Sequence, residues 1–125
     1  MDKKKILIVD DEIELTEMLA MRLRASGYEV VAIPDGEGAL QKMRAEKPDL
    51  VILDIMLPNI DGYEICEAIK KDSVFKKTPV ILLTAKDPGH EMDKIREAGA
   101  DSCMVKPFEP KDLLEKIREL IKKNS

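Results

Sequence analysis

The chain has 125 residues and a formal net charge of −4, from 21 Lys and Arg against 25 Asp and Glu. A chain of this length buries about two-thirds of its unfolded surface, so it needs no disulfide or structural metal to fold as one domain. The acidic balance and the 3% aromatic content argue against a basic surface with stacking rings. We therefore expect no direct binding of nucleic acid.

The cysteines and the apolar runs exclude two further classes of protein. Cys66 and Cys103 stand far apart with no neighbouring Cys or His, so they fit neither a zinc site nor a redox pair, and we expect buried free thiols. The apolar runs are only about four residues long, too short to cross a bilayer. Residues 1–5 lead into no signal-peptide core, so we expect a soluble, cytoplasmic protein with no membrane contact.

Five segments have the length and composition of strands. Four of them carry Ile, Val and Leu at consecutive positions, namely residues 5–9, 29–33, 50–55 and 79–83, and residues 101–106 form a weaker fifth. Consecutive apolar positions are typical of strands in a parallel sheet that is covered on both faces.

Segments with helical spacing of apolar residues separate and follow these strands. The first predicted helix has a left-handed end at Gly27, and the second is capped by Asp35 and ends before Pro48. The third carries Ile65, Cys66 and Ile69 on its apolar side. The fourth starts at Asp87 and ends at Gly99, and the fifth starts near Pro110. Five alternating strands and helices predict an α/β fold with a doubly wound parallel sheet, formed by residues 1–125 as one domain.

The carboxyl ends of the predicted strands collect residues that can do chemistry. They are Asp10, Asp11 and Glu12 after the first strand, Asp54 in the third, Thr84 after the fourth and Lys106 after the fifth. Parallel strands end at one edge of the sheet, where ligands bind in open α/β folds. We expect these side chains to converge if strands one, three, four and five are neighbours.

This set of residue types points to phosphoryl chemistry. Clustered carboxylates raise one another's pKa unless a cation compensates, and hard oxygen donors without His or thiolate favour Mg²⁺. Lys106 either neutralises a carboxylate or holds an anionic ligand, and Thr84 adds a hydrogen-bond partner. The set suits a phosphoryl group bound beside Mg²⁺, with an aspartate as the nucleophile that forms an acyl phosphate.

Each residue also has a purely structural explanation. The acidic run at residues 10–12 is able to cap a helix, Thr84 to end a strand and Lys106 to lie in an ordinary loop. Asp54 is harder to explain in this way, because a charge that follows four apolar residues is costly to bury without a partner. The joint occurrence at strand ends favours the functional interpretation.

Five motifs, taken in order, resemble the receiver domain of bacterial two-component response regulators over essentially the whole chain. They are residues 6–12 (I-L-I-V-D-D-E), 50–62 (L-V-I-L-D-I-M-L-P-N-I-D-G), 80–85 (V-I-L-L-T-A), 99–101 (G-A-D) and 105–108 (V-K-P-F). The resemblance implies the flavodoxin-like fold of chemotaxis receivers, with five helices and five parallel strands in the order 2-1-3-4-5. It also implies a cis peptide bond between Lys106 and Pro107.

The resemblance further implies a role for each residue of the set except Glu12. Asp54 would accept a phosphoryl group from the phosphohistidine of a sensor histidine kinase or a histidine phosphotransfer protein. Mg²⁺ would be bound by Asp11, Asp54 and the backbone carbonyl of Met56, with Asp10 acting through a metal-bound water. Lys106 would pair with the phosphoryl oxygens, and Thr84 would move to hydrogen-bond them.

The implied function is a signalling switch and not an enzyme that acts on other substrates, although it catalyses its own Mg²⁺-dependent phosphorylation and dephosphorylation. Output would pass to a downstream protein target through the face formed by the fourth helix, the fifth strand and the fifth helix. Dimerisation driven by phosphorylation is left open.

The chain departs from the family three residues before Lys106, where receivers commonly carry Tyr or Phe and this chain has Cys103. A thiol cannot swing a ring between buried and exposed positions. We therefore hypothesise that the switch depends more on the loop of residues 84–89 or on backbone shifts.

Two other functions fit the sequence less well. A Mg²⁺-dependent phosphatase that forms an aspartyl phosphate typically has a second Asp two residues after the nucleophile, where this chain has Met56. A flavodoxin-like carrier needs a phosphate loop rich in Ser, Thr and Gly after the first strand, and this chain has acidic residues there.

Overall fold

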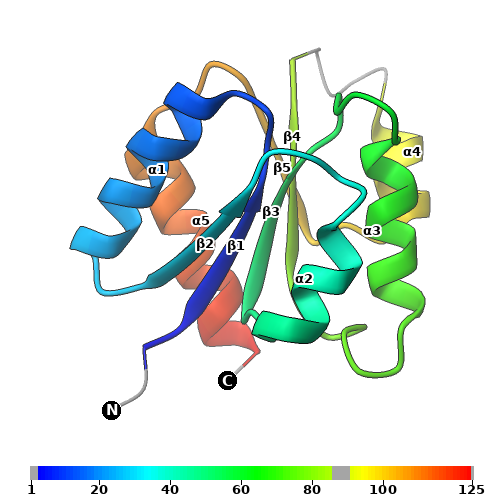
Figure 1. Ribbon diagram of the computed structural model, residues 1–125, viewed down its shortest axis with the longest axis horizontal. Coiled ribbons are helices and arrows are strands. Elements are labelled where there is room, and N and C mark those ends of the chain that lie inside the picture. The colour runs from blue at the N-terminus through cyan, green and yellow to red at the C-terminus, as the bar shows by residue number, and fades with distance from the viewer. Residues whose placement is uncertain (1–2, 86–90, 125) are drawn as a thin grey trace.

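The computed structural model describes residues 3–85 and 91–124 of the chain. Strands and helices alternate along these residues (Figure 1): β1 Lys5–Val9, α1 Ile13–Ala25, β2 Glu29–Ile33, α2 Ala39–Glu46, β3 Leu50–Asp54, α3 Gly62–Lys71, β4 Val80–Thr84, α4 Met92–Ala98, β5 Ser102–Val105 and α5 Pro110–Lys123. The predicted α/β fold is confirmed. The expected start of the fourth helix at Asp87 lies outside the described residues.

The strands form a five-stranded sheet in the order β2-β1-β3-β4-β5, and all four pairings are parallel. This order, expected from the family resemblance, is confirmed. Every residue of β3 and β4 is buried, whereas the edge strands β2 and β5 are partly exposed. The long apolar runs of the sequence therefore belong to the central strands, which helices cover on both faces.

Helices cover both faces of the sheet, with α1 and α5 on one face and α2, α3 and α4 on the other (Figure 1). Because successive side chains of a strand point to opposite faces, each central strand supplies both cores. In β1, Ile6 and Ile8 pack with α1 and α5, while Leu7 and Val9 pack with α2 and α3. The two cores hold the central strands in place from both sides.

The helix ends agree with the sequence at two glycines and differ at Asp35. Gly27 follows α1 with a φ of 97°, the left-handed conformation predicted for it, and Gly99 ends α4 as predicted, with a φ of 81°. Asp35 does not cap α2, because the helix begins only at Ala39 after Gly38. Instead, Asp35 Oδ1 accepts the N–H of Gly38 at 3.2 Å in the turn that connects β2 to α2.

Two further expectations concern the backbone and the membrane. The peptide bond between Lys106 and Pro107 is cis, as expected. Within residues 3–85 and 91–124, no helix has the length and apolar character required to cross a bilayer.

Both cysteines are free, but only Cys66 is fully buried. Its Sγ donates a hydrogen bond to the carbonyl oxygen of Ala98 at 3.4 Å. Cys103 is half-buried, so the expectation of a buried thiol is wrong in part for this residue. The reason is its position on the edge strand β5, which its neighbours cover incompletely.

We expect Cys66 to react with Ellman's reagent much more slowly than Cys103 in the folded protein. Burial raises the pKa of Cys66 to about 12, and the thiolate is the reactive form. The variants Cys66→Ala and Cys103→Ala each leave one thiol, whose reaction is followed by absorbance. Similar rates in denaturant are the control, and similar rates in native buffer would contradict the prediction.

The start of α3 lies directly against the end of β3, and only glycine fits there. A Cβ on Gly62 would lie 2.6 Å from the carbonyl oxygen of Asp54 and 2.6 Å from the Cα of Ile55. Backbone atoms cannot rotate out of the way as a side chain can. The close approach therefore sets where the chain runs after β3.

We expect Gly62→Ala to lower the free energy of unfolding by about 1–3 kcal/mol, because the backbone after β3 must shift. Urea denaturation measures this change. Gly38→Ala is the matched control, since its Cβ would have no heavy atom closer than 3.7 Å and a compatible glycine site is neutral or gains up to about 1 kcal/mol. Equal effects of the two substitutions would count against the argument.

Candidate functional site

Asp10, Asp54 and Lys106 meet at the carboxyl edge of the sheet. Asp10 directly follows β1, Asp54 is the last residue of β3, and Lys106 directly follows β5. Strand β1 pairs with β3, and β4 lies between β3 and β5, so these three strands end along one edge. Both aspartates are buried, with 2% of Asp10 and 5% of Asp54 exposed.

The Lys106 ammonium lies among three carboxylates. Its Nζ is 2.6 Å from Oε1 of Glu12, 2.8 Å from Oδ2 of Asp10 and 3.2 Å from Oδ2 of Asp54. The transfer of like charges from water into this edge is costly, and a close cation offsets part of that cost. The lysine therefore allows two aspartates to lie buried and adjacent.

The electrostatic balance changes the pKa of both Asp10 and Lys106. Burial raises the pKa of Asp10, and the hydrogen bonds from Lys106 and from the backbone of Glu12 offset this only in part. Burial by itself lowers the pKa of Lys106, but its hydrogen bonds to Asp10 and Glu12 and its attraction to both aspartates raise it by more. The lysine consequently keeps its charge at neutral pH.

Backbone N–H groups orient the remaining oxygens of the two aspartates. Asp10 Oδ1 accepts the N–H of Glu12 at 2.9 Å, and Asp54 Oδ1 accepts the N–H of Met56 at 3.0 Å. Each buried aspartate thus has one oxygen against the backbone of the following loop and the other against Lys106. Neither carboxylate is free to rotate without the loss of a contact.

Three carboxylates of this edge could hold a metal ion. Oxygens of Asp10, Glu12 and Asp54 all lie within 4.8 Å of one another. The donors are hard oxygens, the type that magnesium and calcium prefer. Glu12 is the member to which the sequence argument gave no role, although it completes the acidic run after β1. Asp11 is exposed and is not part of this group.

Thr84 and Met56 lie next to this cluster. Thr84 ends β4 and is buried, and its carbonyl oxygen accepts the backbone N–H of Lys106 at 2.7 Å. Its neighbour Leu83 pairs with Asp54 in the sheet. The Met56 side chain is exposed, and its residue bridges to Asp61 across the loop after β3. The loop hypothesis for residues 84–89 falls mostly on residues 86–90, which lie outside the described part of the chain.

Contacts connect the loop after β3 to the start of α4. Asp61 caps α3 by accepting the N–H of Tyr63 at 2.9 Å. The Tyr63 hydroxyl donates to Oε2 of Glu91 at 2.5 Å, and Lys94 Nζ lies 5.9 Å from the centre of the Tyr63 ring. Tyr63 and Cys103 belong to the same apolar cluster, so the α3 side supplies an aromatic ring near the position where β5 carries a thiol.

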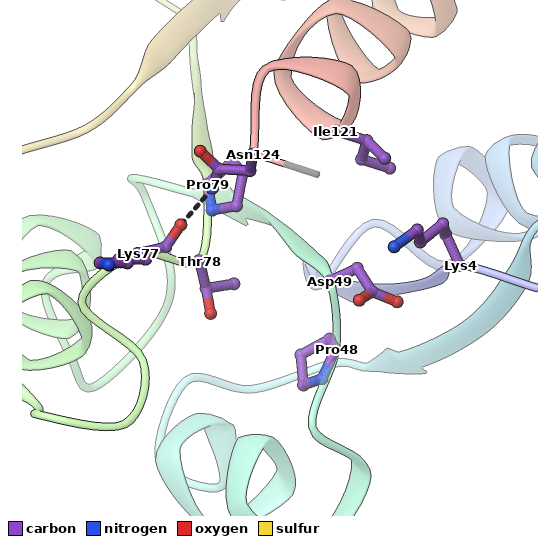
Figure 2. Close-up of a pocket in the computed structure, with 8 residues that line it drawn as sticks. All are labelled: Lys4, Pro48, Asp49, Lys77, Thr78, Pro79, Ile121 and Asn124. Carbon is purple, nitrogen blue, oxygen red and sulfur yellow. Dashed lines mark hydrogen bonds between the residues drawn. The ribbon is translucent and has the colours of Figure 1, made fainter.

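The opposite edge of the sheet also has a pocket, shown in Figure 2. It is lined by Lys4, Pro48, Asp49, Lys77, Thr78, Pro79, Ile121 and Asn124. Asp49 is its carboxylate, and one of its oxygens already accepts the backbone N–H of Lys5 at 2.7 Å. Asn124 Nδ2 donates to the carbonyl oxygen of Lys77 there. This pocket lacks a cluster of acidic side chains around a lysine, so the carboxyl edge is the candidate site.

Comparison with known proteins gives the same family for the whole chain. The family model for the response regulator receiver domain matches residues 6–118. The protein named "Probable transcriptional regulator ycf27" from Cyanophora paradoxa is 48% identical over 124 residues, which are 98% of this chain and 50% of that protein. The alkaline phosphatase synthesis transcriptional regulatory protein PhoP of Bacillus subtilis is 42% identical over 123 residues, which are 97% of this chain and 50% of that protein. The chain thus spans about half the length of the curated relatives it matches.

A solved structure extends the agreement to the fold. The chemotaxis response regulator CheY4 of Vibrio cholerae superposes with a TM-score of 0.89 at 33% identity, over 95% of this chain and 99% of that one. Its similarity accords with the sheet order and the helix layers described above. The chain therefore belongs to the response regulator receiver domain family and is the receiver domain of a two-component response regulator.

Proposed function

We propose that Asp54 is the residue on which this receiver domain carries its phosphoryl group, and that residues 1–125 act as one unit. The supporting observation is the contact between Asp54 Oδ2 and Lys106 Nζ at 3.2 Å. A buried carboxylate beside a permanent cation is a nucleophile whose product, an anionic phosphoryl group, has a charge partner in place. The family membership of the chain supports the same assignment.

The proposed transfer takes the phosphoryl group from the phosphohistidine of a histidine kinase or a histidine phosphotransfer protein. A carboxylate oxygen of Asp54 attacks the phosphorus, an O–P bond forms, and the P–N bond to the imidazole breaks with its electron pair returning to the nitrogen. Lys106 donates hydrogen bonds to the phosphoryl oxygens, and the Thr84 hydroxyl moves to donate another. Positioning and charge stabilisation of this kind supply most of the catalysis in phosphoryl transfer.

The reverse change is hydrolysis of the acyl phosphate. Water attacks the phosphorus, the O–P bond to Asp54 breaks, and inorganic phosphate leaves while the carboxylate is restored. We infer that the residues around Asp54 promote this step as well, so that the domain catalyses both its own phosphorylation and its own dephosphorylation. The domain is then a switch with a limited lifetime and not an enzyme for other substrates.

We propose Mg²⁺ as the metal of this site. Asp11, Asp54 and the backbone carbonyl of Met56 would hold it, and Asp10 would act on it without direct contact. The support is the chemistry of the hard oxygen donors and the position of Asp54, which belongs both to this ligand set and to the group of Asp10, Glu12 and Asp54 whose oxygens lie within 4.8 Å of one another. When bound, Mg²⁺ neutralises charge on the phosphoryl oxygens.

Two surfaces fit the partners of such a switch. A cavity of about 490 Å³ beside the site is lined by Glu12, Leu15, Met18, Ala85, Lys106, Pro107 and Phe108, and its apolar side chains suit a phosphodonor protein. The proposed output surface is the face of α4, β5 and α5, where Met92 and Val105 are exposed. We place the protein in the cytoplasm, with a protein target, no nucleic acid and no membrane as partner of these residues. Dimerisation upon phosphorylation is a further property to measure.

We expect one phosphoryl group on the wild type after incubation with acetyl phosphate and Mg²⁺, and none on Asp54→Ala. Intact-protein mass spectrometry measures the gain, and a second incubation replaces acetyl phosphate with a phosphorylated histidine kinase. Asp93→Ala, which removes an acid from the first turn of α4, is the control and gains the phosphoryl group normally. A gain on folded Asp54→Ala, or no gain on the wild type from either donor, would refute the proposal.

A further inference from the structure

The carboxylate closest to Lys106 is Glu12 and not the proposed phosphoacceptor. The distances from Lys106 Nζ are 2.6 Å to Glu12 Oε1 and 3.2 Å to Asp54 Oδ2. Glu12 comes from the loop that enters α1, 94 residues before the lysine in sequence. This contact joins the start of α1 to the end of β5 at the carboxyl edge of the sheet.

The number of N–H donors on Lys106 limits how many acceptor oxygens it can bind. An ammonium group has three N–H donors, and Lys106 faces three carboxylates, those of Asp10, Glu12 and Asp54. Phosphorylation of Asp54 removes the charge of that carboxylate, so the N–H that points at Asp54 becomes available to the phosphoryl group, while Asp10 and Glu12 keep their charges beside the lysine. A further hydrogen bond from Lys106 to the phosphoryl oxygens has to compete with one of these two remaining carboxylates.

The exposed fraction of each side chain indicates which carboxylate can most easily move away from Lys106. The side chains of Asp10 and Asp54 are 1% and 8% exposed, whereas that of Glu12 is 58% exposed. Release of a buried carboxylate leaves a charge without its partner, but Glu12 can turn into water at little cost. The Glu12 side chain also makes no capping bond to α1, so its movement leaves the helix start intact.

The backbone of Glu12 is fixed while its side chain is free to turn. Its N–H donates to Asp10 Oδ1 at 2.9 Å, and its carbonyl oxygen accepts the N–H of Thr16 at 3.0 Å. The carboxylate is therefore able to turn toward or away from Lys106 while the backbone of Glu12 stays in place. This geometry allows Glu12 to form its ion pair with Lys106 reversibly.

We propose that Glu12 is a positioning residue that holds Lys106 in the resting protein and yields it to the phosphoryl group. Glu12 thereby competes with the phosphoryl group and sets how tightly the site binds it. This inference rests on the proposed phosphorylation of Asp54. The sequence alone indicated no role for Glu12, and this inference gives it a regulatory effect on the phosphorylation site.

Binding of beryllofluoride, an analogue of the phosphoryl group, tests the inference at saturating Mg²⁺. Glu12→Gln removes the charge and keeps the size of the side chain. Glu12→Asp keeps the charge but shortens the reach by one C–C bond, about 1.5 Å, which breaks a contact of 2.6 Å. We expect each variant to bind beryllofluoride about fivefold more tightly than the wild type, the factor that such an ion pair is worth.

Glu14→Gln is the matched control, because Glu14 lies in the first turn of α1 and its loss changes the net charge equally. We expect it to leave the affinity within about twofold of the wild type, because Glu14 is exposed and is not one of the three carboxylates that contact Lys106. A purely long-range charge effect predicts a different pattern, in which Glu12→Gln and Glu14→Gln both bind more tightly and Glu12→Asp does not. That pattern, or unchanged or weaker binding in both Glu12 variants, would overturn the inference.

A second measurement separates this inference from the proposed function. Hydrogen exchange of the Lys106 ammonium, followed by NMR without any phosphoryl analogue, should be faster in Glu12→Asp and Glu12→Gln than in the wild type and Glu14→Gln. Equal exchange in all four proteins overturns the role of Glu12 even if Asp54 is phosphorylated. Faster exchange in the Glu12 variants, together with no phosphorylation of the wild type, supports the contact and refutes the function proposed for Asp54.

Discussion

The ion pair between Lys106 and the buried carboxylates of Asp10 and Asp54 is the contact on which the rest of the site depends. Two aspartates without a cation would repel each other at this edge, and burial alone already raises the pKa of Asp10. The lysine comes from the end of β5, the last strand of the sheet, whereas Asp10 follows β1. The charge balance of the site is therefore complete only when the sheet is assembled from β1 to β5.

The sheet holds these charges in place because its central strands are packed from both sides. All residues of β3 and β4 are buried, and alternate residues of β1 enter the two cores. A polar group at the end of such a strand is held in place, because a shift of the strand would disturb close-packed side chains on both faces of the sheet. The loops add orientation through backbone N–H groups, which leave one oxygen of each aspartate directed at Lys106.

The contacts around Asp54 also reach the surface proposed for output. Asp54 accepts the N–H of Met56, whose residue bridges to Asp61, and Asp61 caps α3 at Tyr63. The Tyr63 hydroxyl then donates to Glu91 at the start of α4. These contacts join the acidic edge to α4 through α3, on the side of the sheet where β5 carries Cys103 in place of an aromatic ring. Tyr63 is thus one α3 side chain that joins the acidic edge to the start of α4.

The sequence by itself determined the fold class, the limits of the strands to within one residue, and the carboxyl edge as the place for chemistry. These features follow from local patterns: consecutive apolar residues, glycines at helix ends, and acids, a threonine or a lysine at the ends of four of the five strands. The strand order came from the family resemblance, because periodicity says nothing about which strands pair. Only the tertiary structure decided that Glu12 lies nearer to Lys106 than Asp54 does, that Asp35 serves a turn and not α2, and that Cys103 is partly exposed. The Glu12 contact and the exposure of Cys103 depend on where distant segments meet, and spacing along one segment carries no information about that. The Asp35 contact is local, but the choice between a turn and a helix cap depends on where the backbone of α2 begins.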